Sequence, residues 1–294
     1  MATRVAYFTA GTVGAGHLVR GEAIRRGLAR AGFTGEVRSF GPATGFDGWL
    51  SGDHLSVEVR DDPMLADPDL APRSALGRAL LDWQPDLVIV DMFWAPVRHL
   101  LARLGCPAWL LVRACPPVWL TGAGAVRFDP GAWDRIVAIE PIGAEVLTHA
   151  IDPIVIANPN ECAGPGRLRE LLGAPDDRPL VVVSHAGKPA ERGELEARAQ
   201  ARAPAGATVV RLDPDGPGRG LFPAARTLGG ADLVVSGVGY NSFWEAHWLG
   251  WHERTEFCPF ARSIDRQGLR LARFRGHRAR ANGADTLAQW VLAS

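Results

Sequence analysis

A histidine occupies a position that phosphate-binding loops usually give to lysine. The segment AGTVGAGHLVRGEAIRRGL, residues 10–28, directly follows the apolar run VAYFT. From Gly11 to Leu18 its spacing matches a P-loop, but His17 stands in place of the lysine that reaches the phosphates. Leu18 likewise replaces the Ser or Thr that holds magnesium. The segment is therefore not a Walker loop.

The same segment also departs from the dinucleotide-binding pattern. Gly14 and Gly16 are followed by Val19 where the third glycine belongs. The next expected strand ends at Phe40 and Gly41 without an acid to bind a ribose. These departures disfavour a nicotinamide-dependent enzyme.

The remaining interpretation is a turn of small residues that opens onto the carboxyl edge of a parallel sheet, where α/β proteins bind ligands. A neutral imidazole at this place can take a proton from a hydroxyl group or a water molecule near physiological pH. We therefore expect His17 to act as a general base. The alternative is that it only caps the helix or packs against it.

Charge and cysteine usage narrow the class of protein. The chain has 32 basic and 32 acidic side chains, so it lacks the basic excess that drives nucleic-acid binding. The four cysteines have no paired zinc or redox spacing, which is typical of reduced thiols in a cytoplasm. No apolar segment of signal-peptide length precedes the first glycines, so we expect a cytoplasmic protein. Arginines and prolines interrupt the most apolar stretch, 100–126, which leaves at most peripheral membrane contact.

Short apolar runs alternate with helical patterns, as they do in parallel sheets with crossover helices. The first half predicts strands at 5–9, 36–40, 87–90, 108–112 and 136–139, and helices after the opening loop and near 75–80. The second half predicts strands at 180–183, 208–212 and 233–236 and helices at 191–201, 241–249 and 264–274. At 294 residues the chain suits two domains, and the Pro-, Gly- and Asn-rich segment after Asp152 separates them. We expect one domain at 1–152 and a second at 153–294.

Two separate motif regions together resemble a known superfamily. The second half contains ADLVVSGVGYNSFWEAHWLG followed by DRQGLRLAR, and the first contains GAGHLVRGEAIRRGL. In this order they resemble the GT-B fold glycosyltransferases, especially the enzyme that attaches N-acetylglucosamine to the lipid-linked cell-wall precursor. The resemblance implies an α/β protein with two Rossmann-like domains facing a central cleft. It makes 1–152 the acceptor or catalytic domain and 153–294 the nucleotide-sugar-binding domain. It also implies that the last helix, near 286–292, packs back on the first domain.

The resemblance assigns donor-binding roles to the second half. The donor diphosphate would be held at a turn and helix start, where backbone N–H groups and the helix dipole attract anions; these residues are Gly239, Tyr240, Asn241 and Ser242. Glu245 would accept hydrogen bonds from ribose hydroxyls; its alternative is a solvated helix acid.

Other donor contacts are expected from two further loops. Asp265 and Gln267 match the family's sugar-reading Asp-x-Gln element, although Gly268 stands where some relatives have a second glutamine. Gly187 and Lys188 fall in the loop after the first strand of the second domain. Lys188, the only lysine, either neutralises phosphate charge or is an ordinary surface residue.

Asp91 is the expected partner of His17. It ends the strand in PDLVIVDMFWAP, and inverting plant-type members of the fold place there an aspartate that orients the catalytic histidine. A carboxylate bonded to one ring nitrogen fixes the tautomer and stabilises the imidazolium. The alternative is a strand-end turn residue.

No metal or other cofactor is required by this interpretation, because a helix end can stabilise the leaving diphosphate. The two DPD triplets, at 67–69 and 213–215, lie in proline- and glycine-bounded loops and are interpreted as turns. The expected substrates are a UDP- or dTDP-sugar and a small-molecule or lipid-linked acceptor. The sequence does not indicate an oligomeric state.

Three functions are compatible with these motifs. The preferred one is an inverting, metal-independent glycosyltransferase in which His17 deprotonates the acceptor. The second is a nucleotide-sugar hydrolase, because GHLVR also resembles the Gly-His-x-x-Arg opening of the UDP-sugar hydrolases of pseudaminic acid synthesis; Arg20 would then be a cleft residue. The third is a non-catalytic nucleotide-sugar binder.

Overall fold

The chain divides into two compact units. The computed structural model describes residues 3–11, 14–45, 52–123, 126–212, 221 and 223–294. The first unit comprises 1–154 and 283–294, and the second comprises 155–282. Each unit contains its own parallel sheet, as the alternation of apolar runs and helical patterns predicts.

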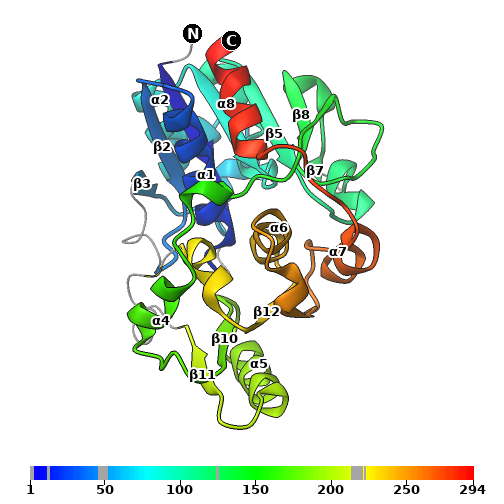
Figure 1. The fold of residues 1–294 in the computed structure, drawn as a ribbon. Helices are drawn as coiled ribbons and strands as arrows, with labels where there is room; N and C mark the ends of the chain where they lie inside the picture. Colours follow the sequence, from blue (N-terminus) through cyan, green and yellow to red (C-terminus); the bar gives the residue numbers. More distant parts are fainter. Residues whose placement is uncertain (1–2, 12–13, 46–51, 124–125, 213–220, 222) are drawn as a thin grey trace. The chain divides into compact units, whose positions relative to one another are not determined.

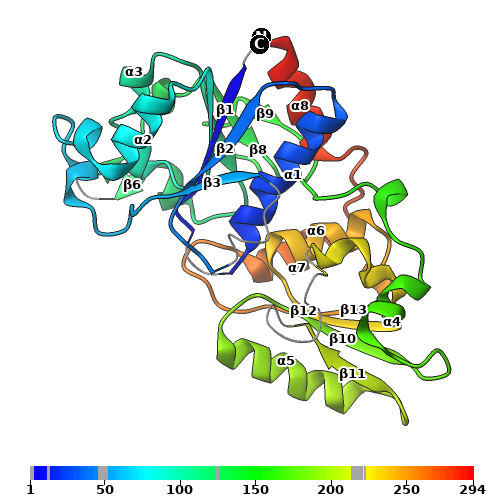
Figure 2. The same cartoon turned by 90° about the vertical axis from the view of Figure 1, so that its left-hand side faces the viewer.

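The first unit is built on a seven-stranded sheet in the order β3-β2-β1-β4-β5-β8-β9, with every neighbouring pair parallel. Its central strands β4 and β5 are buried along their whole length because helices cover both faces of such a sheet (Figure 2). The strands are β1 (Arg4–Phe8), β2 (Glu36–Gly41), β3 (Asp53–Ser56), β4 (Leu87–Asp91), β5 (Ala108–Val112), β8 (Arg135–Ala138) and β9 (His149–Ala150). A separate antiparallel pair is formed by β6 (Gly122–Ala123) and β7 (Val126–Arg127).

Helices α1 (Gly16–Arg30) and α8 (Gly283–Ala293) lie side by side on one face of this sheet (Figures 1 and 2). Helices α2 (Ala75–Trp83) and α3 (Leu101–Leu104) lie on the other face (Figure 2). Gly27 gives α1 its close approach to α8, since a Cβ there would lie 2.5 Å from the carbonyl oxygen of Ala284. At the exposed end of the pair, Arg30 Nε donates to Asp285 Oδ1 over 2.8 Å.

The second unit has a four-stranded parallel sheet in the order β11-β10-β12-β13. Its strands are β10 (Leu180–Ser184), β11 (Thr208–Arg211), β12 (Leu233–Gly237) and β13 (Thr255–Cys258). Its helices are α4 (Gly166–Leu172), α5 (Pro189–Arg202), α6 (Tyr240–Trp248) and α7 (Gln267–Phe274).

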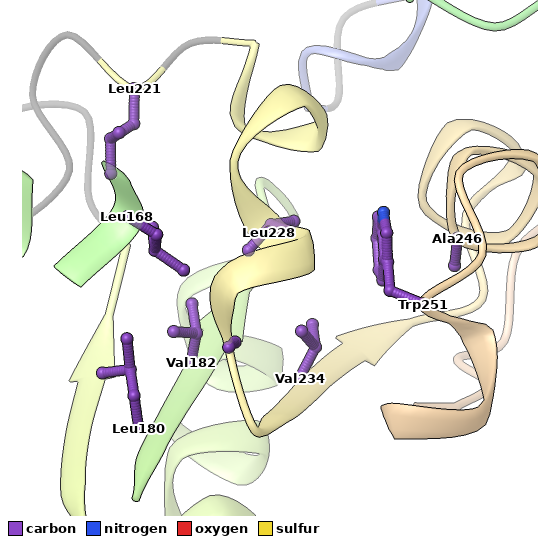
Figure 3. Close-up of a cluster of buried hydrophobic side chains, with 9 residues drawn as sticks. Leu168, Leu180, Val182, Leu221, Leu228, Val234, Ala246 and Trp251 are labelled. Atoms are coloured by element: carbon purple, nitrogen blue, oxygen red, sulfur yellow. The ribbon is translucent and has the colours of Figure 1, made fainter. Parts of the chain in front are cut away.

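Alternate residues of β10 point to two different cores. Leu180 and Val182 pack with Leu168 of α4 and Ala246 of α6, and Trp251 closes that cluster (Figure 3). Val181 and Val183 pack instead against α5. The two-residue period of a strand thus accounts for a continuous apolar run that is buried on both sides.

The strands predicted from apolar runs are confirmed to within one residue at each end. The short strands β3, β6, β7, β9 and β13 were not predicted, and α7 begins at Gln267 rather than at 264. The boundary expected at 152/153 lies two residues from the junction at 154/155. The last helix, assigned above to a domain spanning 153–294, belongs to the first unit because α8 packs on α1.

Among the described residues, none of the helices combines the length and the apolar character needed to cross a membrane.

We predict that Gly27→Ala destabilises the protein by about 1–3 kcal/mol, because the added methyl group overpacks the contact between α1 and α8. The matched control is Gly193→Ala in α5, where a Cβ meets no atom within 4 Å. There the helix propensity of alanine should add about 0.5–1 kcal/mol of stability. Urea unfolding of both variants measures the difference, and equal effects would contradict the packing argument.

Candidate functional site

The strand order of the first sheet places a switch point between β1 and β4. The chain runs outward from β1 through β2 to β3 on one side and from β4 through β5 to β8 on the other. Loops that leave β1 and β4 therefore diverge, and α/β proteins bind ligands at this switch point. His17 follows β1 at the start of α1, and Asp91 is the last residue of the adjacent β4.

At this edge, His17 Nδ1 lies 2.7 Å from Asp91 Oδ2. The same oxygen accepts from Arg20 Nε at 3.0 Å and from the second guanidinium nitrogen at 2.7 Å. The Tyr7 hydroxyl lies 2.6 Å from it and donates to it, with the His17 carbonyl 2.8 Å away as a second acceptor. Side chains from β1, α1 and β4 thus converge on one buried oxygen.

These contacts determine the protonation states of Asp91 and His17. Burial alone would raise the pKa of the Asp91 carboxyl, but the charge of Arg20 and the hydrogen bonds from His17 and Arg20 hold it below its ordinary value. Burial lowers the pKa of His17, and the charges of Arg20 and Arg113 lower it further against the opposing effect of Asp91. Because Nδ1 faces a carboxylate, it carries the proton of a neutral ring. Nε2 is then the basic nitrogen.

Small residues leave room for the imidazole. A Cβ at Gly11 would collide with the His17 ring, so only glycine fits there. Gly14 has a φ of 71°, a left-handed conformation that favours glycine. Gly16 begins α1, and a Cβ there would meet no atom within 4 Å. On another side the ring of Phe93 lies 5.1 Å from that of His17.

In the second unit, the predicted diphosphate turn lies at the start of a helix. Gly239 is the N-cap of α6, which begins at Tyr240. The first helical hydrogen bond runs from Phe243 N to the Gly239 carbonyl, so the N–H groups of Asn241 and Ser242 precede the helical ladder. A Cβ at Gly239 would meet no described atom within 4 Å. The positive end of the helix therefore lies at a residue with open space around its Cβ position.

Glu245, one turn along α6, is a buried carboxyl group, 8% exposed. Its Oε1 has no hydrogen-bond partner among the described residues. Burial raises the pKa of Glu245 to about 7. It is therefore not the solvated helix acid considered as an alternative above.

The Asp-x-Gln element has partners within its own unit. Asp265 Oδ1 accepts from the fully buried Arg270 at 2.7 Å, and the same guanidinium donates to the Val238 carbonyl at 2.8 Å. Gln267 Oε1 accepts from Phe260 N at 2.9 Å. These bonds tie the start of α7 to the turn before α6. A direct sugar contact of Asp265 or Gln267 stays a prediction.

The loop after β10 contains a cluster that the sequence did not indicate. His185 Nε2 lies 3.0 Å from Glu191 Oε2, and Arg262 binds both carboxylate oxygens of Glu191. Burial raises the pKa of Glu191, but the hydrogen bonds from Arg262, His185 and the Lys188 N–H, together with the charge of Arg262, outweigh it and bring the value to about 2. A Cβ at either Gly187 or Gly237 would collide with the His185 ring.

Lys188, expected at this loop, is exposed and precedes α5. Its backbone N–H donates to Glu191 Oε2 over 3.1 Å. Residues separated by many positions in sequence form the cluster, and spacing alone could not reveal it. The one available signal was His185 at the end of an apolar strand, the same signal that drew attention to His17.

The first DPD triplet is a turn, since Asp67 Oδ1 accepts from the backbone N–H groups of Asp69 and Leu70. The second, at 213–215, lies outside the described residues. Within the described part of the chain, His, Cys, Asp and Glu side chains form no group of three or more suited to a metal ion.

Solved structures resemble the chain although no family model and no curated protein sequence matches it. The spinosyn forosaminyltransferase SpnP aligns with a TM-score of 0.60 at 17% identity, covering 100% of this chain and 90% of that one. Phytolacca americana UGT2, complexed with UDP-2-fluoro-glucose and pterostilbene, gives 0.56 at 15% identity, covering 99% and 90%. The spinosyn rhamnosyltransferase SpnG, complexed with thymidine diphosphate, gives 0.52 at 17% identity, covering 84% and 78%. The chain has the GT-B fold of these glycosyltransferases, with two Rossmann-like domains.

We predict that Gly11→Ala displaces the His17 ring and breaks its bond to Asp91, because the new methyl group and the imidazole cannot occupy the same space. The downfield NMR signal of the Nδ1 proton should disappear. Gly16→Ala, one residue before His17 but with open space at its Cβ, should preserve that signal. An unchanged signal in Gly11→Ala would contradict the assigned contact.

We predict that Glu245→Gln changes the pH dependence of stability. A carboxyl whose pKa is about 7 when folded binds more protons than it does when unfolded, so wild-type stability falls as pH rises from about 4.5 through 7. From pH 5 to pH 8 the variant should therefore gain up to about 3 kcal/mol relative to wild type. Guanidinium unfolding at both pH values measures this, and a constant difference would show that Glu245 does not titrate near pH 7.

Proposed function

We propose that the protein is a glycosyltransferase that moves a sugar from a nucleoside-diphosphate donor to an acceptor hydroxyl, with inversion at the anomeric carbon. The observation that carries this proposal is the 2.7 Å contact between His17 Nδ1 and Asp91 Oδ2 at the switch point of the first sheet. This contact orients the ring and leaves Nε2 as a base. The GT-B fold supports the choice of reaction class.

In the proposed reaction His17 Nε2 takes the proton of the acceptor hydroxyl as its oxygen attacks the anomeric carbon. The bond from that carbon to the diphosphate oxygen breaks in the same step, and the nucleoside diphosphate leaves with the electron pair. Asp91 stabilises the imidazolium that forms. One displacement at the anomeric carbon inverts its configuration.

The second unit is proposed to bind the donor. The start of α6 at Gly239–Ser242 would hold the diphosphate and stabilise the charge that develops on it, so the mechanism has no need of a metal ion. Glu245 would accept from the ribose hydroxyls, which supplies a partner for its Oε1. The loop at Gly187 and Lys188 would contribute a further positive charge. Asp265 and Gln267 would shape the sugar site through the start of α7.

The donor is proposed to be a UDP- or dTDP-sugar and the acceptor a small molecule. UGT2 was solved with a UDP-sugar analogue and pterostilbene, and SpnG with thymidine diphosphate, which supports these classes without choosing between them. The narrower resemblance to the N-acetylglucosaminyltransferase of the lipid-linked precursor, and with it a lipid-linked acceptor, stays a prediction.

A nucleotide-sugar hydrolase is the second candidate, and the position of Arg20 favours it. The Gly-His-x-x-Arg resemblance to such hydrolases requires Arg20 at the site rather than on the helix surface. Arg20 is 2% exposed and bonded to Asp91. In this reaction His17 would deprotonate water in place of an acceptor hydroxyl.

We predict that His17→Ala lowers kcat by about 10²–10⁴-fold, the usual contribution of a general base. Nucleotide affinity, measured by calorimetry, should stay near the wild-type value, because the proposed donor residues belong to the second unit. Glu245→Gln should instead change the affinity and raise the donor Kd. Normal turnover in His17→Ala would refute the catalytic assignment.

The donor is found first by a thermal-shift screen of nucleotides and nucleotide sugars, since a ligand of the folded state raises the melting temperature. Wild-type protein is then incubated with the best donor, with and without acceptors. Glycoside formed only with acceptor supports the transferase, and prompt release of free sugar without acceptor supports the hydrolase. Binding without any turnover would indicate a non-catalytic binder and refute both.

A further inference from the structure

Arg20 is part of the contact between His17 and Asp91. It lies three residues after His17 on α1, so both side chains leave the same face of the helix. Both its Nε and a terminal nitrogen donate to Asp91 Oδ2, and that terminal nitrogen lies 3.0 Å from His17 Nδ1. A guanidinium is thereby buried directly beside the imidazole.

The charges around His17 can be counted. Asp91, at the end of β4, is the negative group. Arg20 on α1 and Arg113, which follows β5, are positive, and Tyr7 on β1 is neutral because burial raises its pKa. Among the described residues, the charges that shift the pKa of His17 are therefore two guanidinium groups and one carboxylate. The buried Glu140 accepts from the N–H of Ala114, the residue after Arg113, and has no resolved effect on His17. The neutral ring faces a carboxylate whose charge is already compensated by Arg20.

The fold fixes this guanidinium in place. Arg20 approaches Asp91 beside the Tyr7 hydroxyl, which also donates to Oδ2. Tyr7 can lie under α1 because residue 21 is glycine, and a Cβ there would approach the tyrosine ring to 2.8 Å. Lysine could supply the same charge at this position but not the two parallel donors of the guanidinium.

We propose that Arg20 is a positioning residue for the general base: it holds the Asp91 carboxylate and keeps His17 a neutral Nδ1–H imidazole whose Nε2 is ready to accept a proton. This inference rests on the proposed function, in which His17 is that base. Without Arg20, the uncompensated carboxylate would draw a proton onto the imidazole. His17 would then be occupied by a proton before the acceptor arrives.

The test compares wild type with Arg20→Met, Arg20→Lys and the control Arg26→Met. Arg26 is on the same helix but pairs with Glu22 at 2.8 Å. Imidazole ¹⁵N NMR follows the titration and tautomer of His17 and needs no substrate. In Arg20→Met we expect the pKa of His17 to rise by about one unit or more, with a smaller rise in Arg20→Lys and none in the control.

The pH profile of kcat/KM separates a positioning role of Arg20 from a merely structural one, because loss of a structural contact would not shift the acid limb. The acid limb of kcat/KM should shift upward in Arg20→Met, so that its loss relative to wild type is about tenfold larger at pH 6 than at pH 8.5. Arg20→Lys should recover part of this shift. A loss of the same size at both pH values would overturn the proposal.

The NMR measurement separates this inference from the proposed function. If wild type turns over no nucleotide sugar, the proposed function fails, yet the titration still decides whether Arg20 controls His17. If Arg20→Met does not fold, the His17 titrations of wild type and Arg20→Lys test the inference. A wild-type His17 that is charged at pH 7, or carries its proton on Nε2, overturns the proposal, as does an unchanged titration in folded Arg20→Met.

Discussion

One buried oxygen, Oδ2 of Asp91, organises the edge of the first sheet. A carboxylate removed from water must recover its solvation from fixed donors, and the chain supplies them from Tyr7, His17 and Arg20. These donors come from β1 and α1, so the charge at the end of β4 fixes the position of the neighbouring helix. The His17 ring is therefore oriented by the same group of bonds that solvates the carboxylate.

The second sheet has the same reversal of strand order as the first, but a different set of side chains lies beside it. Its strand order reverses between β10 and β12, and the loops leaving these strands contain His185 and Gly239. Here too a histidine contacts a carboxylate that an arginine binds. The carboxylate belongs to the start of α5 rather than to a strand end, so it also accepts from a backbone N–H at that helix terminus. This contact stabilises the loop in addition to orienting the ring.

The sequence predicted best where burial imposes a pattern. Strands such as β4 and β5 are buried on both faces, and their apolar runs gave their limits to within one residue. The edge strand β3 is largely exposed and contains Asp53 and His54, so it has no apolar signal. Ion pairs between distant residues were harder still to predict from the sequence. Arg262 and Glu191 are 71 residues apart, and only the folded chain brings them together.

The same physical distinction separates the acids of the second unit. Asp265 is bonded to Arg270, and Glu191 to Arg262, so both carboxylates are already compensated within the fold. Glu245 is as deeply buried, but its Oε1 has no partner among the described residues. An uncompensated buried carboxyl lowers stability at neutral pH, and a core residue of the same size would avoid that loss. The ribose hydroxyls of the proposed donor would supply the missing hydrogen bonds one turn from the start of α6 and so offset that loss.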